Sequence, residues 1–158
     1  MPITITAERP DKPDAQMLIA ELEDHLAPMY PAASRHGYSV QKLIREGVDF
    51  FVLRQDGVPA GCGGVQFYDG TYGEIKRMFV RPQFRGRGLA KKMLEHLEAH
   101  TRAQGVYTLR LETGIHQHDA IQLYERMGFY NIPPFGAYRE DPLSRFYEKA
   151  LKKELGSR

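Results

Sequence analysis

Residues 80–90, Val-Arg-Pro-Gln-Phe-Arg-Gly-Arg-Gly-Leu-Ala, constrain the fold more than any other part of this sequence. They lie between a strand-like run, Tyr72–Val80, and an amphipathic helical pattern, Leu89–Gln104. Free amides and the dipole at a helix N-terminus attract phosphate groups, and glycine lets a phosphate approach the backbone. Arg85 and Arg87 add charged donors. The segment therefore predicts a phosphate-binding loop between a strand and a helix.

The spacing of this loop excludes two common phosphate sites. A Walker-type loop requires G-x-x-x-x-G-K-[ST], and a dinucleotide-binding fold requires G-x-G-x-x-G; the segment contains neither pattern. An ordinary surface loop is the alternative reading of the Arg-Gly-Arg-Gly tetrapeptide taken alone. Its place between a strand and a helix favours the phosphate site.

The remaining hydrophobic patterns predict alternating strands and helices. The expected strands are 3–6, 49–54, 58–68, 72–80, 106–112, a strand from 129 onward and 144–151; the expected helices are one starting near 13, then 39–45, 89–104 and 118–127. This order predicts a mixed central sheet of six to seven strands with helices on both faces, in the α/β (α+β) class.

Two local patterns make further structural predictions. Asp11, followed by Pro13, is expected to cap the first helix, and His118 or Asp119 the last. Three glycines interrupt the strand 58–68, which predicts a bulge or a close approach of another segment to the backbone. They are Gly61, Gly63 and Gly64.

Composition limits the classes of partner. The chain has 158 residues, 42% of them hydrophobic, which fits one domain spanning 1–158. A net charge of +2 is far below that of dedicated nucleic-acid binders, and no apolar run approaches the roughly 20 residues that span a bilayer. The single cysteine, Cys62, and an N-terminus without signal-peptide features indicate the cytoplasm. We therefore expect neither nucleic acid nor membrane as a partner.

Two motifs resemble those of one enzyme family. Gln83–Gly88 matches the signature [QR]-x-x-G-x-[GA] of the GNAT superfamily of N-acetyltransferases, and 74–82 looks like that family's fourth strand. Downstream, Ala120–Phe129 is similar to its A-x-x-L-Y-x-x-x-G-F element. The detailed match covers about 73–129, whereas the N-terminal third agrees only in the order of its elements.

The resemblance implies acetyl-CoA as the co-substrate, without a metal. Backbone amides of 85–90 would hold the pyrophosphate, and the pantetheine arm would pair with 78–80, in a cleft where the fourth and fifth strands splay apart. Gln117 stands where many relatives have Asn. The implied cofactor-binding residues are Met78, Phe79, Val80, Gln83, Arg85, Gly86, Arg87, Gly88, Leu89, Ala90, Gln117 and Tyr124.

Aminolysis of a thioester needs a neutral amine, and an alkylamine is neutral only about once in 10³ molecules at pH 7. Glu74, which faces the cleft in the family pattern, is the candidate general base. Two alternatives remain. Many relatives in the family use a chain of water molecules instead of a side-chain base, and Glu74 can be a solvated strand-edge carboxylate paired with Lys76 or Arg77.

Tyr124 matches the family's acid, which lies near the sulfur of the thioester. A free tyrosine is a weaker acid than a thiol, so a hydrogen bond to the developing thiolate suffices for this role. The alternative is a core tyrosine packed with Ile121 and Met127. For the thioester carbonyl, the resemblance implies a main-chain N–H near Met78 as the donor.

Other reactive side chains have simpler interpretations. Cys62 lies in a glycine-rich strand without a nucleophile motif, which favours a small buried residue over an acyl carrier. His96 and His100 are one helical turn apart but lack the adjacent Glu of a zinc-protease motif. His116 and His118 adjoin the cofactor region and are candidates for orienting the substrate or acting as a base, with ordinary helix capping as the alternative.

The segment 132–144 resembles the tail of a bacterial GNAT subgroup and leaves the acetyl acceptor open. Tyr138 and Arg139 suit an amine that bears a carboxylate, whereas Glu140 and Asp141 suit a polyamine. A rigid crossover to the last strand is an equally good interpretation, because prolines and glycines restrict the shape of this segment.

The leading functional hypothesis is direct acetyl transfer to the primary amine of a small molecule in a ternary complex. The alternatives are a protein lysine or N-terminal acetyltransferase, a non-catalytic acetyl-CoA-binding regulator, and an Arg-Gly-type nucleic-acid binder. Low net charge disfavours the last of these. Because dimers are common in the superfamily, a homodimer is expected by analogy.

Overall fold

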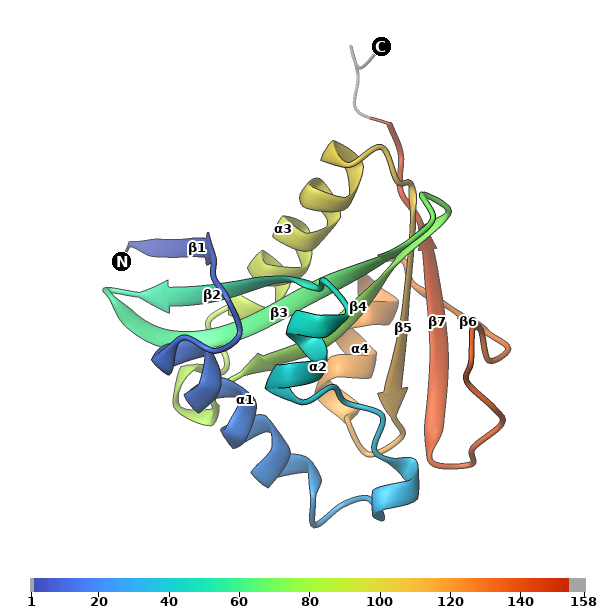
Figure 1. Ribbon diagram of the computed structural model, residues 1–158, viewed down its shortest axis with the longest axis horizontal. Coiled ribbons are helices and arrows are strands. Elements are labelled where there is room, and N and C mark those ends of the chain that lie inside the picture. Colours follow the sequence, from blue (N-terminus) through green and yellow to red (C-terminus); the bar gives the residue numbers. More distant parts are fainter. Residues whose placement is uncertain (1, 154–158) are drawn as a thin grey trace.

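The computed structural model describes residues 2–153, which form a seven-stranded sheet flanked by helices (Figure 1). The elements are β1 (Ile3–Ala7), α1 (Pro13–Leu26), α2 (Val40–Arg45), β2 (Asp49–Gln55), β3 (Val58–Tyr68), β4 (Tyr72–Val80), α3 (Leu89–Ala103), β5 (Thr108–Gly114), α4 (His118–Arg126), β6 (Tyr130–Ile132) and β7 (Ser144–Ala150). This order confirms the predicted alternation and the mixed α/β class. Within 2–153, no helix is both long and apolar enough to cross a membrane.

The sheet has the order β1-β2-β3-β4-β5-β7-β6 and separates two hydrophobic cores. Side chains of β2 alternate between them: Phe50 and Val52 pack under α1 and α2, whereas Phe51 and Leu53 pack under α3 and α4. Figure 1 shows these two pairs of helices on opposite faces of the sheet. The prediction of helices on both faces is therefore confirmed.

β4 and β5 are parallel, and the two strands pair over a very short stretch. Their described register is limited to Gly73 with Leu109 and Glu74 with Arg110. Beyond Glu74 the strands diverge toward their C-terminal ends (Figure 1). The expected splay between the fourth and fifth strands is confirmed, and it exposes the edge of β4 over its last residues.

A bulge lies in β4 immediately before that exposed edge. The register between β3 and β4 shifts so that Gly63 faces both Arg77 and Met78, and Arg77 has a φ of 55°. A Cβ on Gly63 would lie 3.2 Å from Met93 Cγ and 3.3 Å from Leu97 Cδ1 of α3. Both predicted reasons for glycine in this strand, a bulge and close packing on the backbone, are present.

Both predicted aspartate or histidine caps are wrong. The N-cap of α1 is Lys12, and the Asp11 side chain instead pairs with an arginine two residues earlier in its own loop. The N-cap of α4 is Gln117, so His118 is the first residue of that helix. In both cases the N-cap lies one residue away from the expected position. Side chains from other parts of the chain, rather than a local cap, fix the start of the helix.

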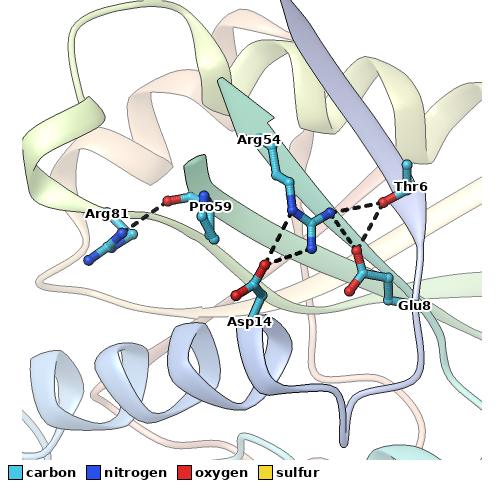
Figure 2. A network of polar contacts seen from close by, with 6 residues as sticks. All are labelled: Thr6, Glu8, Asp14, Arg54, Pro59 and Arg81. Carbon is cyan, nitrogen blue, oxygen red and sulfur yellow. Dashed lines mark hydrogen bonds and ion pairs between the residues drawn. The ribbon is translucent and has the colours of Figure 1, made fainter. Parts of the chain in front are cut away.

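Arg54 of β2 ties the N-terminal segment to the sheet (Figure 2). Its Nη2 lies 2.8 Å from Asp14 Oδ2 at the start of α1, and its Nη1 donates to Glu8 Oε2 at 2.5 Å and to Thr6 Oγ1 at 3.2 Å. The hydrogen bond from Arg54 is the main reason that the pKa of Glu8 is lowered. One guanidinium therefore connects β1, the following loop and α1.

We expect Arg54→Met to lower the free energy of unfolding at pH 7 by roughly 2 kcal/mol, because charged hydrogen bonds are lost. A carboxylate with a depressed pKa stabilises the fold above its unfolded pKa and loses that effect as the pH falls through its folded pKa. The difference from wild type should therefore shrink in denaturant titrations below about pH 4. Arg9→Met, at an exposed ion pair of the same loop, is the control and should leave the midpoint unchanged; an equal change in both variants would contradict the prediction.

Candidate active site

A cleft of about 860 Å³ lies beside the diverging end of β4. Its walls come from the last residues of β4, the loop and first turn of α3, the length of α4, and the end of α1 with the segment after it. Ten residues of the expected cofactor site line it: Met78, Phe79, Val80, Arg85, Gly86, Gly88, Leu89, Ala90, Gln117 and Tyr124. Of the other expected site residues, Gln83, Arg87 and Glu74 lie outside this lining.

The loop before α3 has the backbone of a phosphate cradle. Gly86 and Gly88 have φ values of 79° and 75°, a left-handed conformation that favours glycine. No atom of the described residues comes within 4 Å of a Cβ built at either position. Gly88 is the N-cap of α3 without a side-chain cap, so the first amides of the helix face open space. These residues fit a bound pyrophosphate.

The two arginines of the loop are held by neighbouring parts of the chain. Arg85 Nε donates to the Val80 carbonyl oxygen at 3.1 Å, and Arg87 Nη1 donates to Gln55 Oε1 at 2.8 Å. These contacts fix the loop against the end of β4 and against β2. The positive charge of both guanidinium groups remains at the cradle.

Tyr124 projects from α4 into the cleft and is almost fully buried. Its hydroxyl lies 3.9 Å from Met78 Sδ, across the cleft from the bulge of β4. Burial, and then the negative charge of Glu112, raise the pKa of Tyr124 far above that of a free tyrosine. The hydroxyl therefore stays protonated and can donate a hydrogen bond throughout the pH range of an enzyme assay.

Tyr30 connects the segment after α1 to the opposite wall of the cleft. Its hydroxyl donates to Gln117 Oε1 at 3.0 Å and accepts from the His116 amide at 2.9 Å. Both of these partners line the cleft, as does His118. The sequence contains no local signal for this contact, because Tyr30 and Gln117 are 87 residues apart.

A second pocket, of about 410 Å³, surrounds Glu74. Glu74 is only 2% exposed, and its carboxylate accepts hydrogen bonds from Lys76 Nζ at 2.9 Å, Tyr138 at 2.6 Å and Tyr68 at 3.3 Å. The alternative of a solvated carboxylate is wrong, although the pairing with Lys76 is confirmed. The structure thus places Glu74 and Tyr124 in different pockets.

Glu112 of β5 lines neither pocket but acts electrostatically on a tyrosine of each, and sequence analysis missed it. It is a half-buried residue of β5, and Ser144 Oγ donates to its carboxylate at 2.8 Å. Burial raises the pKa of Glu112. After burial, its negative charge helps to raise the pKa of Tyr124 in the first pocket and of Tyr138 in the second. An alternating strand pattern alone does not single out such a residue.

Of the C-terminal candidates, Tyr138 reaches the second pocket directly. Arg139 and Glu140 are exposed and lie outside its lining. Asp141 faces His36, whose Nε2 is 3.6 Å from the carboxylate. The choice between a carboxylate-bearing acceptor and a polyamine therefore depends on other residues.

Cys62 and the helix histidines have structural positions. Cys62 is fully buried, its Sγ donates to the Arg77 carbonyl oxygen at 3.2 Å, and burial raises its pKa to about 12. This confirms a small buried residue, held as a thiol. His100 Nε2 lies 2.8 Å from Asp49 Oδ2, and burial lowers the pKa of His96. These side chains support the packing of α3 on the sheet.

The family model for the acetyltransferase (GNAT) family matches residues 16–129. The chain belongs to this family. It is therefore a GNAT N-acetyltransferase, and the motif resemblance in 73–129 is confirmed.

Known relatives of this GNAT protein cover nearly its whole length. An IAA acetyltransferase of Azospirillum brasilense is 43% identical over 150 residues, covering 94% of this chain and 98% of the relative. The crystal structure of a protein of Klebsiella pneumoniae assigned as an acyl-CoA N-acyltransferase is 38% identical with a TM-score of 0.80, covering 95% and 98% of the two chains. The PaiA N-acetyltransferase of Thermoplasma acidophilum, solved with coenzyme A, shares the fold at 19% identity, with a TM-score of 0.74 and coverage of 95% and 99%.

Proposed function

We propose that this acetyltransferase transfers the acetyl group of acetyl-CoA directly to the primary amine of a small molecule, with both substrates bound at once. The observation that carries this proposal is the pair of pockets along one splayed strand. The first pocket is lined by Met78 and the second by Lys76, two residues apart on β4. At about 3.3 Å per residue, the two sites are close enough for direct transfer.

The first cleft suits acetyl-CoA, which would supply the acetyl thioester. Amides of 86–90 would hold its pyrophosphate, and the open edge of β4 at 78–80 would pair with the pantetheine arm. The PaiA relative, which has the same fold, was solved with coenzyme A. The bulge at Arg77 disrupts the ladder and leaves a backbone amide near Met78 to polarise the thioester carbonyl.

The second pocket suits the acceptor, and its proton chemistry points to Glu112. Glu74 already accepts three hydrogen bonds, so we assign it to positioning Tyr138 and Lys76. Glu112 acts electrostatically on a tyrosine of each pocket, and its partial burial raises its pKa, a direction that suits a general base. It would take a proton from the ammonium group of the acceptor, so that the neutral amine attacks the thioester carbonyl, while Tyr124 donates a hydrogen bond to the departing thiolate sulfur.

Direct transfer requires no covalent carrier on the protein. Cys62, the single cysteine, is buried and held as a thiol by a raised pKa. A thiol in this state is a poor nucleophile. Its burial therefore supports a ternary complex over a two-step exchange.

The proposed function is tested by measuring free thiol released from acetyl-CoA with a panel of amino acids, polyamines, aminoglycosides and short lysine peptides. We expect amine-dependent release, with Tyr124→Phe lowering kcat roughly 10–100-fold while the KM for acetyl-CoA changes little, because only the hydroxyl is lost. Tyr130→Phe, at an exposed tyrosine outside both pockets, is the matched control. Full turnover by Tyr124→Phe would contradict the assigned role, and an absence of release with every acceptor would contradict the function.

A further inference from the structure

The walls of the second pocket are aromatic. Four tyrosines line it, and the rings of two of them, Tyr68 and Tyr72, are stacked with centroids 4.8 Å apart. Tyr138 packs edge-on against His36, with centroids 5.4 Å apart. With a volume of about 410 Å³ and aromatic walls around Glu74, the pocket has the size of a site for a small organic molecule.

The charge of this pocket is unbalanced in favour of cations. The described lining contains Arg35, Lys42 and Lys76 but a single carboxylate, Glu74. Lys76 lies 2.9 Å from Glu74, so these two charges compensate each other. The remaining ionic groups at the wall are therefore positive.

Arg35 is poorly compensated within the described chain. Its Nη1 is 3.8 Å from Glu23 Oε2, while the same carboxylate forms a close ion pair with Arg77. One acid thus serves two guanidinium groups. Arg35 Nε is buried and has no hydrogen-bond partner among residues 2–153. A buried donor in this state indicates an acceptor that comes from outside the chain.

Lys42 supplies the second free charge of the wall. Its Nζ lies over the ring of Tyr38, 4.4 Å from the centroid, and no ion pair is formed with a described carboxylate. Lys42 belongs to α2, and Arg35 lies in the segment just before that helix. The two cations therefore reach the pocket from one continuous segment of the chain, residues 35–42.

We propose that this pocket selects an acetyl acceptor that carries a carboxylate, with that carboxylate bound by Arg35 and Lys42. This inference rests on the proposed function, because it assigns the chemical class of the amine. An amino acid meets both requirements: its carboxylate compensates the two cations, and its amine can extend toward Glu112. A polyamine would instead add positive charge to a wall that is already positive.

The test compares amino acids with their decarboxylated amines and their carboxamides, which share the same body but lack the negative charge. We expect wild-type kcat/KM to be at least 10-fold higher for the carboxylate form, mainly through KM. Lys42→Met and Arg35→Gln should each lower that preference several-fold, and Lys42→Glu should abolish or reverse it. Direct binding of the amino acids, measured by calorimetry without acetyl-CoA, should weaken in parallel.

Lys92→Glu makes the same charge change on the exposed side of α3, outside both pockets, and should retain the wild-type preference. Equal or faster acetylation of the decarboxylated amines would overturn this inference and leave the acetyltransferase assignment intact. If Lys92→Glu also loses the preference for the carboxylate form, the inference is overturned as well, because the preference would then depend on the overall charge of the protein and not on contacts in the pocket. An absence of acetylation for every amine would instead remove the proposed function itself.

Discussion

Replacing Glu112 with glutamine is expected to lower kcat by roughly 10²–10³-fold, which is the usual contribution of a positioned general base. The amide keeps the shape of the side chain and can still accept from Ser144, but it cannot take the proton of the amine. The KM for acetyl-CoA should change little, because Glu112 lies outside the lining of the first cleft. Steady-state thiol release with the best acceptor measures both constants.

The pH dependence separates this role from a structural one. Only the deprotonated carboxylate accepts a proton, so wild-type activity should rise with pH through the pKa of Glu112. Because burial raises that pKa, the acidic limb of kcat should lie above 4.5, the ordinary value for glutamate. The charged and polar groups acting on it are Ser144, His36, Glu74 and Lys76. Glu112→Gln should lose this limb.

Glu74→Gln is the matched control for that experiment. It removes a second buried carboxylate but should retain the acidic limb, because Glu74 is assigned to positioning. If the acidic limb of kcat is lost in Glu74→Gln but kept in Glu112→Gln, the general base is Glu74, the residue predicted from the sequence. Stability gives a further check: a carboxyl group with a raised folded pKa destabilises the fold as the pH rises through that pKa. Glu112→Gln should therefore unfold no more easily than wild type at pH 7.

The parts of the site that could be predicted from sequence are those whose conformation depends on residues close together in the chain. Gly86 and Gly88 need left-handed backbone at the start of a helix, and this requirement is visible in a few consecutive positions. Tyr124 follows from the spacing of one short helix. For the same reason the order of the strands and helices was predictable along the whole described chain.

The acceptor side could not be predicted, because it is assembled from distant segments. Tyr138 reaches Glu74 across 64 residues, and Glu112 meets Ser144 only because β5 pairs with β7. No pattern in the sequence around Glu74 indicates that its carboxylate is buried and already accepts three hydrogen bonds. The wrong cap at Asp11 has the same origin, since Arg54 and its partners hold the entry to α1 from the sheet.

Gly114→Ala should be among the most destabilising single-methyl changes in this chain, although alanine is normally well tolerated in a strand. A Cβ at Gly114 would lie 2.1 Å from the Tyr30 hydroxyl oxygen and 2.2 Å from its Cζ. The buried ring would have to move, and its hydrogen bonds to Gln117 and His116 would be lost. We expect a loss of roughly 2–3 kcal/mol in the free energy of unfolding, measured by denaturant titration.

The same change should weaken acetyl-CoA binding several-fold, because Gln117 and His116 line the cofactor cleft and lose their shared partner. Tyr30→Phe separates the two effects: it removes the hydrogen bonds but keeps the ring, so binding should weaken with a smaller loss of stability. In the double variant Tyr30→Ala with Gly114→Ala, the added methyl meets no ring, so it should cost little beyond Tyr30→Ala alone. Additive losses, or a Gly114→Ala protein with wild-type stability and affinity, would show that Tyr30 does not hold this wall of the cleft.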